Sequence, residues 1–219
     1  MLSVVIPALN ASTTLPGAIA AVAAEAAEIV VADGGSTDGT PAMAEAAGAR
    51  VLRVARGRGT QLAAGIAAAR FPWLLLLHAD TRLGPGWGAA AARHMTSDPE
   101  RAGYFRFALD SEDRRARRLE RAVAWRCRVL ALPYGDQGLL IHRDLLAAVG
   151  GLRPLPLMED VDLVRRLGRT RLVSLDAVAL TSAARWERDG WSARSGRNLL
   201  CLAAWFAGVP PARIARFYR

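Results

Sequence analysis

Short apolar runs alternate with alanine-rich segments along the first 83 residues, and this alternation constrains the fold more than any other feature of the sequence. A repeated strand-then-helix order is the pattern of β-α units in a mostly parallel sheet. The run Leu74–Leu77 is apolar on both faces, as expected of a central strand that helices cover on each side. The pattern predicts strands at 3–6, 29–32, 51–54 and 73–77, and helices at 12–27, 41–47 and 60–69.

From about residue 101 the pattern becomes mixed. It predicts strands at 104–109 and 138–141, and helices at 114–130, 144–150 and 159–168. Thr40 followed by Pro41 fits an N-cap and a first helical position. Because no repeat or low-complexity linker interrupts the chain, we expect residues 1–219 to form one α/β domain. Its sheet would be mostly parallel, with helices on both faces and a smaller mixed region in the second half.

Composition excludes several kinds of chemistry. The chain has a formal charge of +9, and all 29 of its basic residues are arginine. Without lysine there is no Schiff base, pyridoxal-phosphate lysine or Walker lysine, whereas arginine binds phosphate oxygens in pairs. Cys127 and Cys201 lack metal-site spacing, so we expect two buried thiols in a reducing compartment. The apolar stretch 199–209 is about half of the ~20 residues that a membrane span needs. We therefore expect a cytoplasmic protein without a signal peptide.

Distinctive residues follow three of the predicted strands. Ligands collect at the carboxyl ends of strands in open parallel sheets. A dinucleotide site of the Rossmann kind would need a glycine-rich turn after the first strand, and none is present, so NAD or FAD is not expected. The residues that should converge are Pro7, Ala8 and Asn10 after the first strand, Asp33 after the second, and His78 and Asp80 after the fourth.

The stretch VVADGGSTDGT, residues 30–40, has two interpretations. Asp33 could accept hydrogen bonds from a base or ribose, while Gly35 and its neighbours let the backbone approach a ligand. Alternatively, Asp33 and Asp38 bond backbone amides in a tight turn. The residues alone leave both open.

His78 and Asp80 also have two interpretations. Side chains two apart at a strand end face the same way, and a carboxylate there suits Mg²⁺ or Mn²⁺, ions that commonly bridge diphosphate oxygens. Alternatively, Asp80 opens a turn and His78 bonds only backbone. The segment Arg56–Gln61 also has two interpretations: it is either an anion-binding site before a helix or a solvated loop.

Three charged segments in the second half complete the set. Glu159-Asp160-Val161-Asp162 would favour a helix dipole, or would supply a general base. Arg114–Arg128 holds seven arginines and an apolar stripe, which is either a solvated helix face or a contact with a phospholipid surface or an acidic acceptor. Arg185–Trp191 is either a flexible lid that carries an arginine toward phosphate or a packed loop.

Together, SVVIPALN, VVADGGSTDGT, RGRGTQLAAG, LLLLHADT and LMEDVDLVRRL resemble, in order and spacing, the motifs of family 2 glycosyltransferases. The resemblance covers residues 3 to about 167. It implies a GT-A fold with a Rossmann-like sheet, in which about 1–100 bind a nucleotide-sugar and about 101–219 bind the acceptor. It further implies transfer of a sugar, with a UDP-sugar as the default donor and GDP- or dTDP-sugars still open.

The resemblance also implies residue roles. Pro7, Ala8 and Asn10 would line the nucleotide pocket with Gly35, and Asp33 would meet the base. Arg58 would approach the diphosphate, Asp80 would hold Mn²⁺ or Mg²⁺ beside His78, and Asp160 would deprotonate the acceptor in an inverting displacement. The residues that we assign to an acceptor site or lid are Asp136, Gln137, Glu159, Arg185 and Trp186.

Two departures from the family pattern matter. The familiar Asp-x-Asp reads His78-Ala79-Asp80, and the acidic residue common after Asn10 is Ala11. A sugar-phosphate nucleotidyltransferase is the alternative enzyme, although the chain lacks lysine and the expected glycine-rich basic loop. A non-catalytic nucleotide-sugar-binding or membrane-surface protein is the second alternative. We expect no nucleic-acid partner, and we expect contact with the inner membrane face to be at most peripheral; the sugar, acceptor and oligomeric state stay open.

Overall fold

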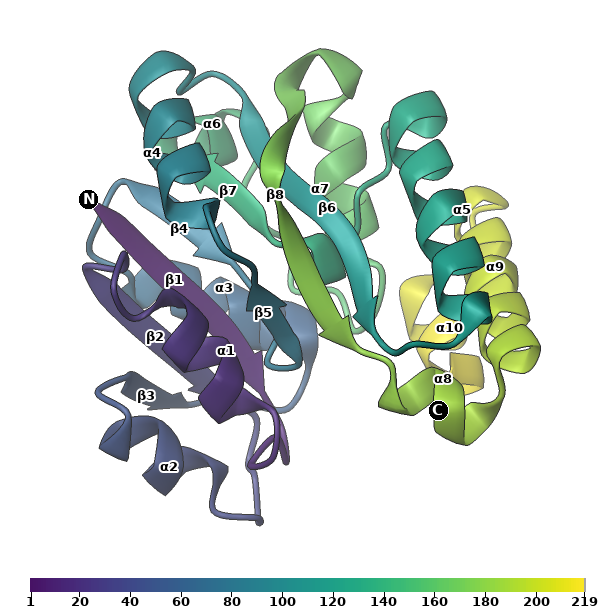
Figure 1. Ribbon diagram of the computed structural model, residues 1–219, viewed down its shortest axis with the longest axis horizontal. Coiled ribbons are helices and arrows are strands. Elements are labelled where there is room, and N and C mark those ends of the chain that lie inside the picture. The colour runs from purple at the N-terminus through teal and green to yellow at the C-terminus, as the bar shows by residue number, and fades with distance from the viewer. Residues whose placement is uncertain (219) are drawn as a thin grey trace.

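One eight-stranded sheet runs through the computed structural model, which describes residues 1–218 (Figure 1). Its strand order is β3-β2-β1-β4-β7-β6-β8-β5. The strands are β1 (Leu2–Ala8), β2 (Glu28–Asp33), β3 (Arg50–Arg53), β4 (Trp73–Leu76), β5 (Thr81–Leu83), β6 (Ala102–Asp110), β7 (Leu139–His142) and β8 (Leu172–Ser182).

The sheet is mostly parallel, as the sequence predicts. Strands β1 to β4 pair in parallel, and β6 pairs in parallel with β8. Strand β7 runs antiparallel to both β4 and β6, and β5 runs antiparallel to β8. Strands β5 and β8 were not predicted. The first is only three residues long, while in β8 the sequence alternates polar and apolar residues from Ser174 to Ala177, which is a signal that could have found it.

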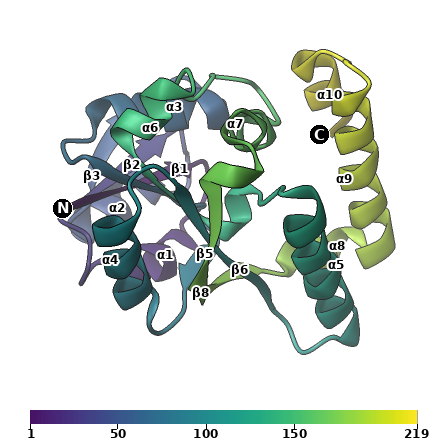
Figure 2. The same ribbon diagram turned by 90° about the horizontal axis from the view of Figure 1, so that it is seen from above.

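Helices cover both faces of the sheet (Figure 2). Helices α1 and α4 pack against Val4, Ile6 and Leu75, whereas α3, α6 and α7 pack against Val5 and Leu74 on the opposite face. Adjacent strand residues point to opposite faces, so this double covering explains why β4, and β1 apart from Ser3, are apolar. The helices are α1 (Leu15–Val22), α2 (Thr40–Ala46), α3 (Arg58–Ala68), α4 (Trp87–Ser97), α5 (Arg114–Leu130), α6 (Arg143–Ala148), α7 (Glu159–Leu167), α8 (Ala184–Asp189), α9 (Trp191–Phe206) and α10 (Pro211–Tyr218).

Two helix starts differ from the prediction. Helix α2 begins at Thr40 itself, after Gly39 with φ +81°, so Thr40 is not the N-cap. Its hydroxyl instead binds Asp38 and accepts from the amide of Ala11 at 2.9 Å, which ties the turn after β2 to the turn after β1. Helix α1 is also shorter than predicted, because residues 11–14 form a turn.

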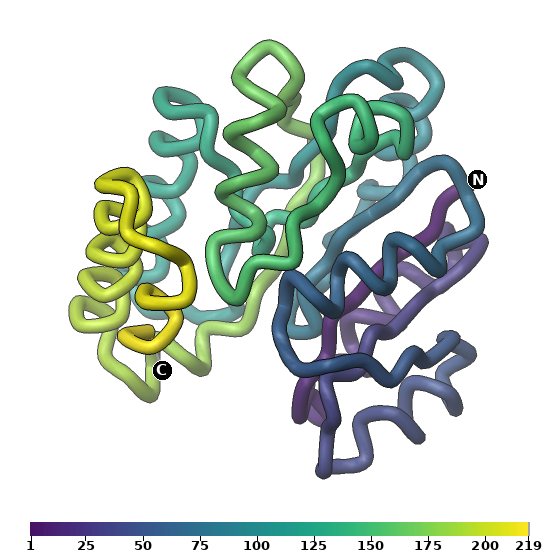
Figure 3. The backbone as a smooth tube through the Cα atoms, turned by 180° about the vertical axis from the view of Figure 1, so that it is seen from behind, coloured from purple at the N-terminus to yellow at the C-terminus, as the bar shows by residue number. Residues whose placement is uncertain are grey.

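The segment 183–218 forms a helical layer beyond β6, next to α5 (Figures 1 and 3). The Arg185–Trp191 segment is packed: it spans α8 and the start of α9, and Trp186 and Trp191 are buried in a cluster with α5. Two short 3-10 helices, Gly135–Gln137 and Arg169–Arg171, connect other elements. Over the residues described, none of the helices combines the length and the apolarity that crossing a membrane requires. Cys127 and Cys201 are buried free thiols in this part of the chain, as predicted.

The close approach of α3 to β1 requires a glycine. A Cβ at Gly65 would lie 2.4 Å from the Val5 Cγ1 atom, whereas no described atom lies within 4 Å of a Cβ at Gly196 in α9. We expect Gly65→Ala to lower the free energy of unfolding by about 1–3 kcal/mol through overpacking. Gly196→Ala should raise it by about 0.5–1 kcal/mol through helix propensity. Urea unfolding of the two variants tests this, and equal effects would contradict the packing.

Candidate active site

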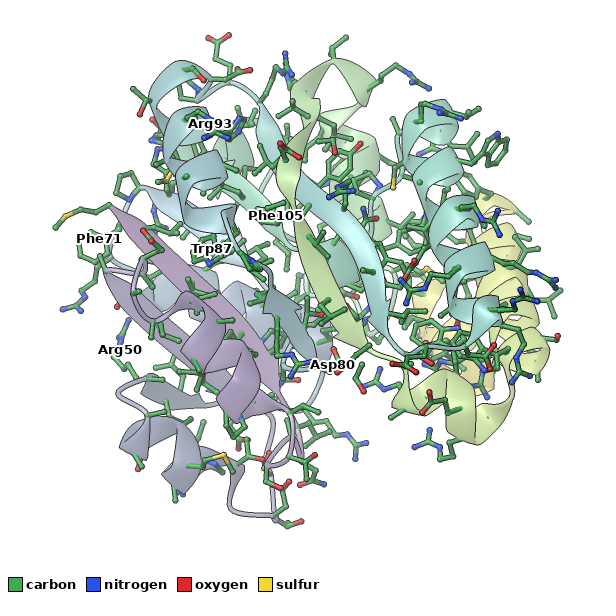
Figure 4. All side chains as sticks on the ribbon, in the orientation of Figure 1. Arg50, Phe71, Asp80, Trp87, Arg93 and Phe105 are labelled. Carbon is green, nitrogen blue, oxygen red and sulfur yellow. The ribbon has the colours of Figure 1, made fainter. Side chains whose placement is uncertain are left out.

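A cleft of about 1730 Å³ opens at the carboxyl ends of β1 and β4. The N-terminal half supplies the ends of these two strands and the start of α3, while α8 and α10 supply the opposite side. Figure 4 shows Asp80 where the two halves meet. Of the predicted donor-site residues, those that line the cleft are Pro7, Ala8, Asn10, Arg58, His78 and Asp80.

Asp33 and Gly35 do not line this cleft. Asp33 is 2% exposed, and its carboxylate accepts from the amides of Gly35 and Ser36, both at 3.0 Å, and binds the Ser36 hydroxyl. Gly35 has φ +89°, a conformation that favours glycine. The structure thus has Asp33 bonding the tight turn, the second of the two interpretations of this stretch. This turn also holds Asn10, because the Asn10 Oδ1 accepts a hydrogen bond from the amide of Thr37 at 2.9 Å.

Gln61 holds the floor of the cleft, a role that was not predicted. Its side chain is 4% exposed, and its Nε2 donates to the carbonyls of Ala8 at 2.7 Å and Ala32 at 2.8 Å. It therefore joins the ends of β1 and β2. The residue stands in the RGRGTQ segment, where the glycines and arginines are the more conspicuous signal.

Arg58, whose side chain is 34% exposed, forms a partly buried ion pair across the two halves. Its Nε binds Oε1 of Glu159, which is 0% exposed and begins α7. Burial raises the pKa of Glu159 above its ordinary value, although Arg58 opposes this effect. Burial alone would lower the pKa of Arg58, but Glu159 and Asp160 raise it, so the guanidinium stays charged. Glu159 therefore serves to hold Arg58 in place, and its side chain does not line the large cleft.

Asp160 lies beside this pair and faces a second cavity. Its Oδ2 accepts from the amide of Gly135 at 2.9 Å, and its Oδ1 accepts from the amide of Val161 at 2.8 Å. Burial alone would raise the pKa of Asp160, but Arg58 and the Gly135 amide outweigh it and hold the pKa below its ordinary value. Asp160 is consequently ionised at neutral pH.

His78 packs closely against Gly135 and is neutral. A Cβ at position 135 would lie 2.4 Å from its Nε2, so only glycine leaves room for the ring. Burial and the nearby Arg58 lower the pKa of His78 to about 4. At neutral pH, the residue that replaces the first Asp of the familiar Asp-x-Asp is therefore an uncharged imidazole.

The second cavity, of about 760 Å³, joins the carboxylates of Asp80, Asp136 and Asp160 to the side chains of α8–α10. Asp136 was predicted at an acceptor site, and burial raises its pKa to about 6, with Asp160 and Asp80 adding to this rise. Its Oδ1 is buried and has no hydrogen-bond partner among residues 1–218. Gln137, by contrast, turns into the core, where its Nε2 donates to the Phe105 carbonyl at 2.9 Å.

The two predicted lid residues reach these cavities from α8. Arg185 lines both of them and approaches the Asp80 carboxylate at 3.6 Å. Trp186 is 8% exposed, lines only the second cavity and packs 5.3 Å beneath the Arg194 guanidinium. Arg56 and Arg188 also line the large cleft, so its lining includes four arginines and the single carboxylate of Asp80.

This donor set fits one kind of metal site. Within residues 1–218, His, Cys, Asp and Glu side chains never gather in a group of three or more that could hold an ion. A site with three or more such side chains is therefore not present in that range. The Asp80 carboxylate, 18% exposed, suits instead a hard ion held by one carboxylate together with substrate phosphates, as Mg²⁺ commonly is.

A cleft at the carboxyl ends of the strands of a mostly parallel sheet is where α/β proteins of this kind bind ligands, and the arginines that line it suit an anionic ligand. The chain belongs to the glycosyltransferases of family 2: the family described as Glycosyl transferase family 2 matches residues 3–153. No curated protein matches the sequence significantly.

Solved structures share the fold. A mycobacterial protein is 26% identical with a TM-score of 0.59, over 83% of this chain and 65% of that chain. Glucosyl-3-phosphoglycerate synthase from Mycobacterium tuberculosis, in complex with Mn²⁺ and UDP-glucose, is 22% identical with a TM-score of 0.59, over 83% and 69%. The same enzyme with Mn²⁺, UDP and glucosyl-3-phosphoglycerate is 23% identical with a TM-score of 0.57, over 83% and 70%. The present chain thus matches about two thirds of the length of these proteins.

The raised pKa of Asp136 predicts a pH-dependent stability. Between pH 4 and about 6 the folded protein keeps this proton while the unfolded chain loses it, so the group lowers stability as the pH rises through this window. We expect Asp136→Asn to gain on the order of 2 kcal/mol over wild type between pH 4 and pH 7. Urea unfolding at each pH measures this. Asp144→Asn, at a side chain 91% exposed, controls for the charge change, and a pH-independent Asp136→Asn difference would contradict the prediction.

Proposed function

We propose that this chain transfers a sugar from a nucleoside diphosphate sugar, with UDP as the first candidate nucleotide, to an acceptor, with inversion at the anomeric carbon. The observation that carries this proposal is that Asp80 and Asp160 face one cavity, while arginines line the adjoining cleft. Arginines are thus placed to bind the negative diphosphate of the donor, and carboxylates are placed to hold a metal ion and to accept the proton of the acceptor.

The donor would lie in the large cleft. Arg56, Arg58, Arg185 and Arg188 line it, and guanidinium groups bind diphosphate oxygens in pairs. Pro7, Ala8 and Asn10 would contact the nucleoside, and Asp33 and Gly35 would act through the shape of the neighbouring turn. The M. tuberculosis enzyme is in complex with UDP-glucose, which supports UDP as the nucleotide to test first.

Asp80 would hold a divalent ion, Mn²⁺ or Mg²⁺, against the diphosphate. The M. tuberculosis enzyme is in complex with Mn²⁺, and the lone carboxylate fits this mode of binding. When bound, the ion would neutralise charge on the leaving diphosphate. Arg185, at 3.6 Å from Asp80, would move onto a phosphate oxygen. His78, neutral beside Asp80, adds no charge to the site.

Asp160 would be the general base. Ionised by Arg58 and two amides, it would accept the proton of an acceptor hydroxyl. The acceptor oxygen would form a bond to the anomeric carbon while the bond from that carbon to the diphosphate oxygen breaks. The electron pair would leave with the nucleoside diphosphate, and arginine would stabilise the developing charge. Asp136 and Trp186 would line the acceptor's cavity.

The alternatives make different products. A sugar-phosphate nucleotidyltransferase would release pyrophosphate from a nucleoside triphosphate, and the family membership of the chain argues against it. A non-catalytic nucleotide-sugar-binding protein would bind the donor and never release nucleotide. His78 in place of an acidic residue is the observation in its favour.

Calorimetric titration tests the donor site first. We expect one of UDP, GDP and dTDP to bind in the presence of Mn²⁺, and EDTA or Asp80→Ala to weaken its binding at least tenfold. Asp144→Ala, an exposed position, is the matched control and should bind as wild type does. Failure of all three nucleotides to bind with Mn²⁺ would refute the donor assignment.

Turnover of the donor tests the base. We expect Asp160→Asn to lower kcat by about 10²-fold or more, because proton transfer contributes about 10²–10⁴-fold. The Kd for nucleotide should change little, because Asp160 faces the second cavity and does not line the large cleft. Release of nucleoside diphosphate, with water or a panel of hydroxyl acceptors, measures this. Near-normal kcat in Asp160→Asn would show that another group takes the proton.

A further inference from the structure

Exposed apolar side chains gather at one end of the molecule. Of the eight large apolar side chains that are well exposed among residues 1–218, seven lie on α5, α9 and α10. These helices stand together beyond β6, at the end opposite β3, in all three backbone views (Figures 1, 2 and 3). The seven are Trp125, Val129, Leu130, Leu199, Leu200, Phe206 and Phe217, and we call them the apolar end.

Helix α5 combines this apolar surface with positive charge. It buries Ala116, Val123 and Cys127 against the core. At 100° per residue, the opposite face carries Trp125 and Val129 together with four of the seven arginines of the helix. These four arginines are Arg114, Arg118, Arg121 and Arg128, all exposed.

Helix α9 has two different faces. Its inner side places Asn198, Cys201 and Leu202 on the second cavity. Its outer side is uncharged and presents Leu199 and Leu200, 66% and 60% exposed. Both of its arginines that follow Trp191, Arg194 and Arg197, bond Asp189 and are not free to neutralise a partner. The sequence from 190 to 218 contains no acidic residue, so the apolar end carries no negative charge on α9 or α10.

We propose that the apolar end docks on an anionic lipid bilayer. Apolar side chains flanked by arginine match an interface with acyl chains below and negative headgroups at the rim. A second copy of this chain is a poorer match, since a symmetric contact would bring the same arginines face to face. Nucleic acid is also a poorer match: Trp125, Phe206 and Phe217 have rings that stack on bases, but the other four side chains are leucine or valine and offer bases neither hydrogen bonds nor stacking.

Docking in this way is peripheral, because α9 is 16 residues long and lies along the surface of the fold. It would also orient the enzyme. Since α9 lines the second cavity with one side and presents Leu199 and Leu200 on the other, that cavity would lie one helix away from the headgroups. This inference is independent of the proposed reaction, because it uses none of the residues assigned to donor or base.

Co-sedimentation with vesicles tests the proposal. We expect the full chain to bind vesicles of equal parts phosphatidylglycerol and phosphatidylcholine, and to bind phosphatidylcholine vesicles at least tenfold more weakly. Salt at about 0.5 M should release most of the protein by screening. No binding to anionic vesicles at low salt, or equal binding to both compositions, would overturn the proposal.

Two variants and a matched control locate the surface. Arg118→Gln/Arg128→Gln should weaken binding about 25-fold, at about fivefold for each arginine near a surface. Leu199→Ser/Leu200→Ser should weaken it at least tenfold. Arg53→Gln/Arg93→Gln removes two exposed arginines elsewhere and should leave binding unchanged.

Each substituted side chain is exposed, and thermal unfolding checks that each variant folds. If the control lost as much binding as the α5 variant, adsorption by overall charge would replace the proposed surface. If wild type were a dimer in light scattering and Leu199→Ser/Leu200→Ser a monomer, a second copy would be the occupant, and the proposal would be wrong.

Discussion

The partly buried pair of Arg58 and Glu159 is the interaction on which the site depends. It joins the first turn of α3 to the first residue of α7, 101 positions later in the chain. Replacing even a fully buried pair by apolar side chains is often neutral, and the partial exposure of Arg58 makes the energetic contribution of this pair smaller still. The main effect of the pair is therefore to position α7 against α3. Next to it, a Cβ on Gly59 would come within 2.4 Å of the Leu155 carbonyl, so the loop before α7 rests directly on α3. Asp160 is placed by this contact.

The same neighbourhood gives three acidic or basic groups different states. Asp160 is held ionised by Arg58 and two amides, whereas Asp136, buried without a partner for its Oδ1 among residues 1–218, has a raised pKa. His78 is kept neutral. Environments that separate the pKa values of neighbouring groups are typical of sites that move protons. A chain whose only strong cation is arginine reaches this arrangement because Arg58 cannot lose its own proton.

Strands β1, β2 and β4 could be predicted because their apolar runs are buried, whereas α4 and β5, also in the first half, were not predicted. The convergence of Asn10, His78 and Asp80 follows from the rule that strand ends meet. Gln61 could not be predicted, because its role depends on two carbonyls brought together only by the sheet. The role of Asp33 could not be decided from the sequence, because a turn and a ligand offer a carboxylate the same hydrogen-bond donors. Helices α8–α10 were not predicted. Helices α8 and α9 pack against α5 through Trp186 and Trp191, which follow no sequence period, and α10 packs on α9.

Strand β5 follows β4 directly in sequence, yet it lies at the far edge of the sheet beside β8. Thr81 pairs with Thr181, their hydroxyls 2.9 Å apart, and the Asp80 carbonyl accepts from the Ser182 amide at 3.0 Å. Closing a loop of this length costs chain entropy before the contact stabilises anything. Helix α1 also packs against β5, but the strand pairing that completes the loop carrying Asp80 forms only when a strand from the last quarter of the chain arrives. During synthesis, the first hundred residues would emerge with their sheet begun and the Asp80 carboxylate still unplaced.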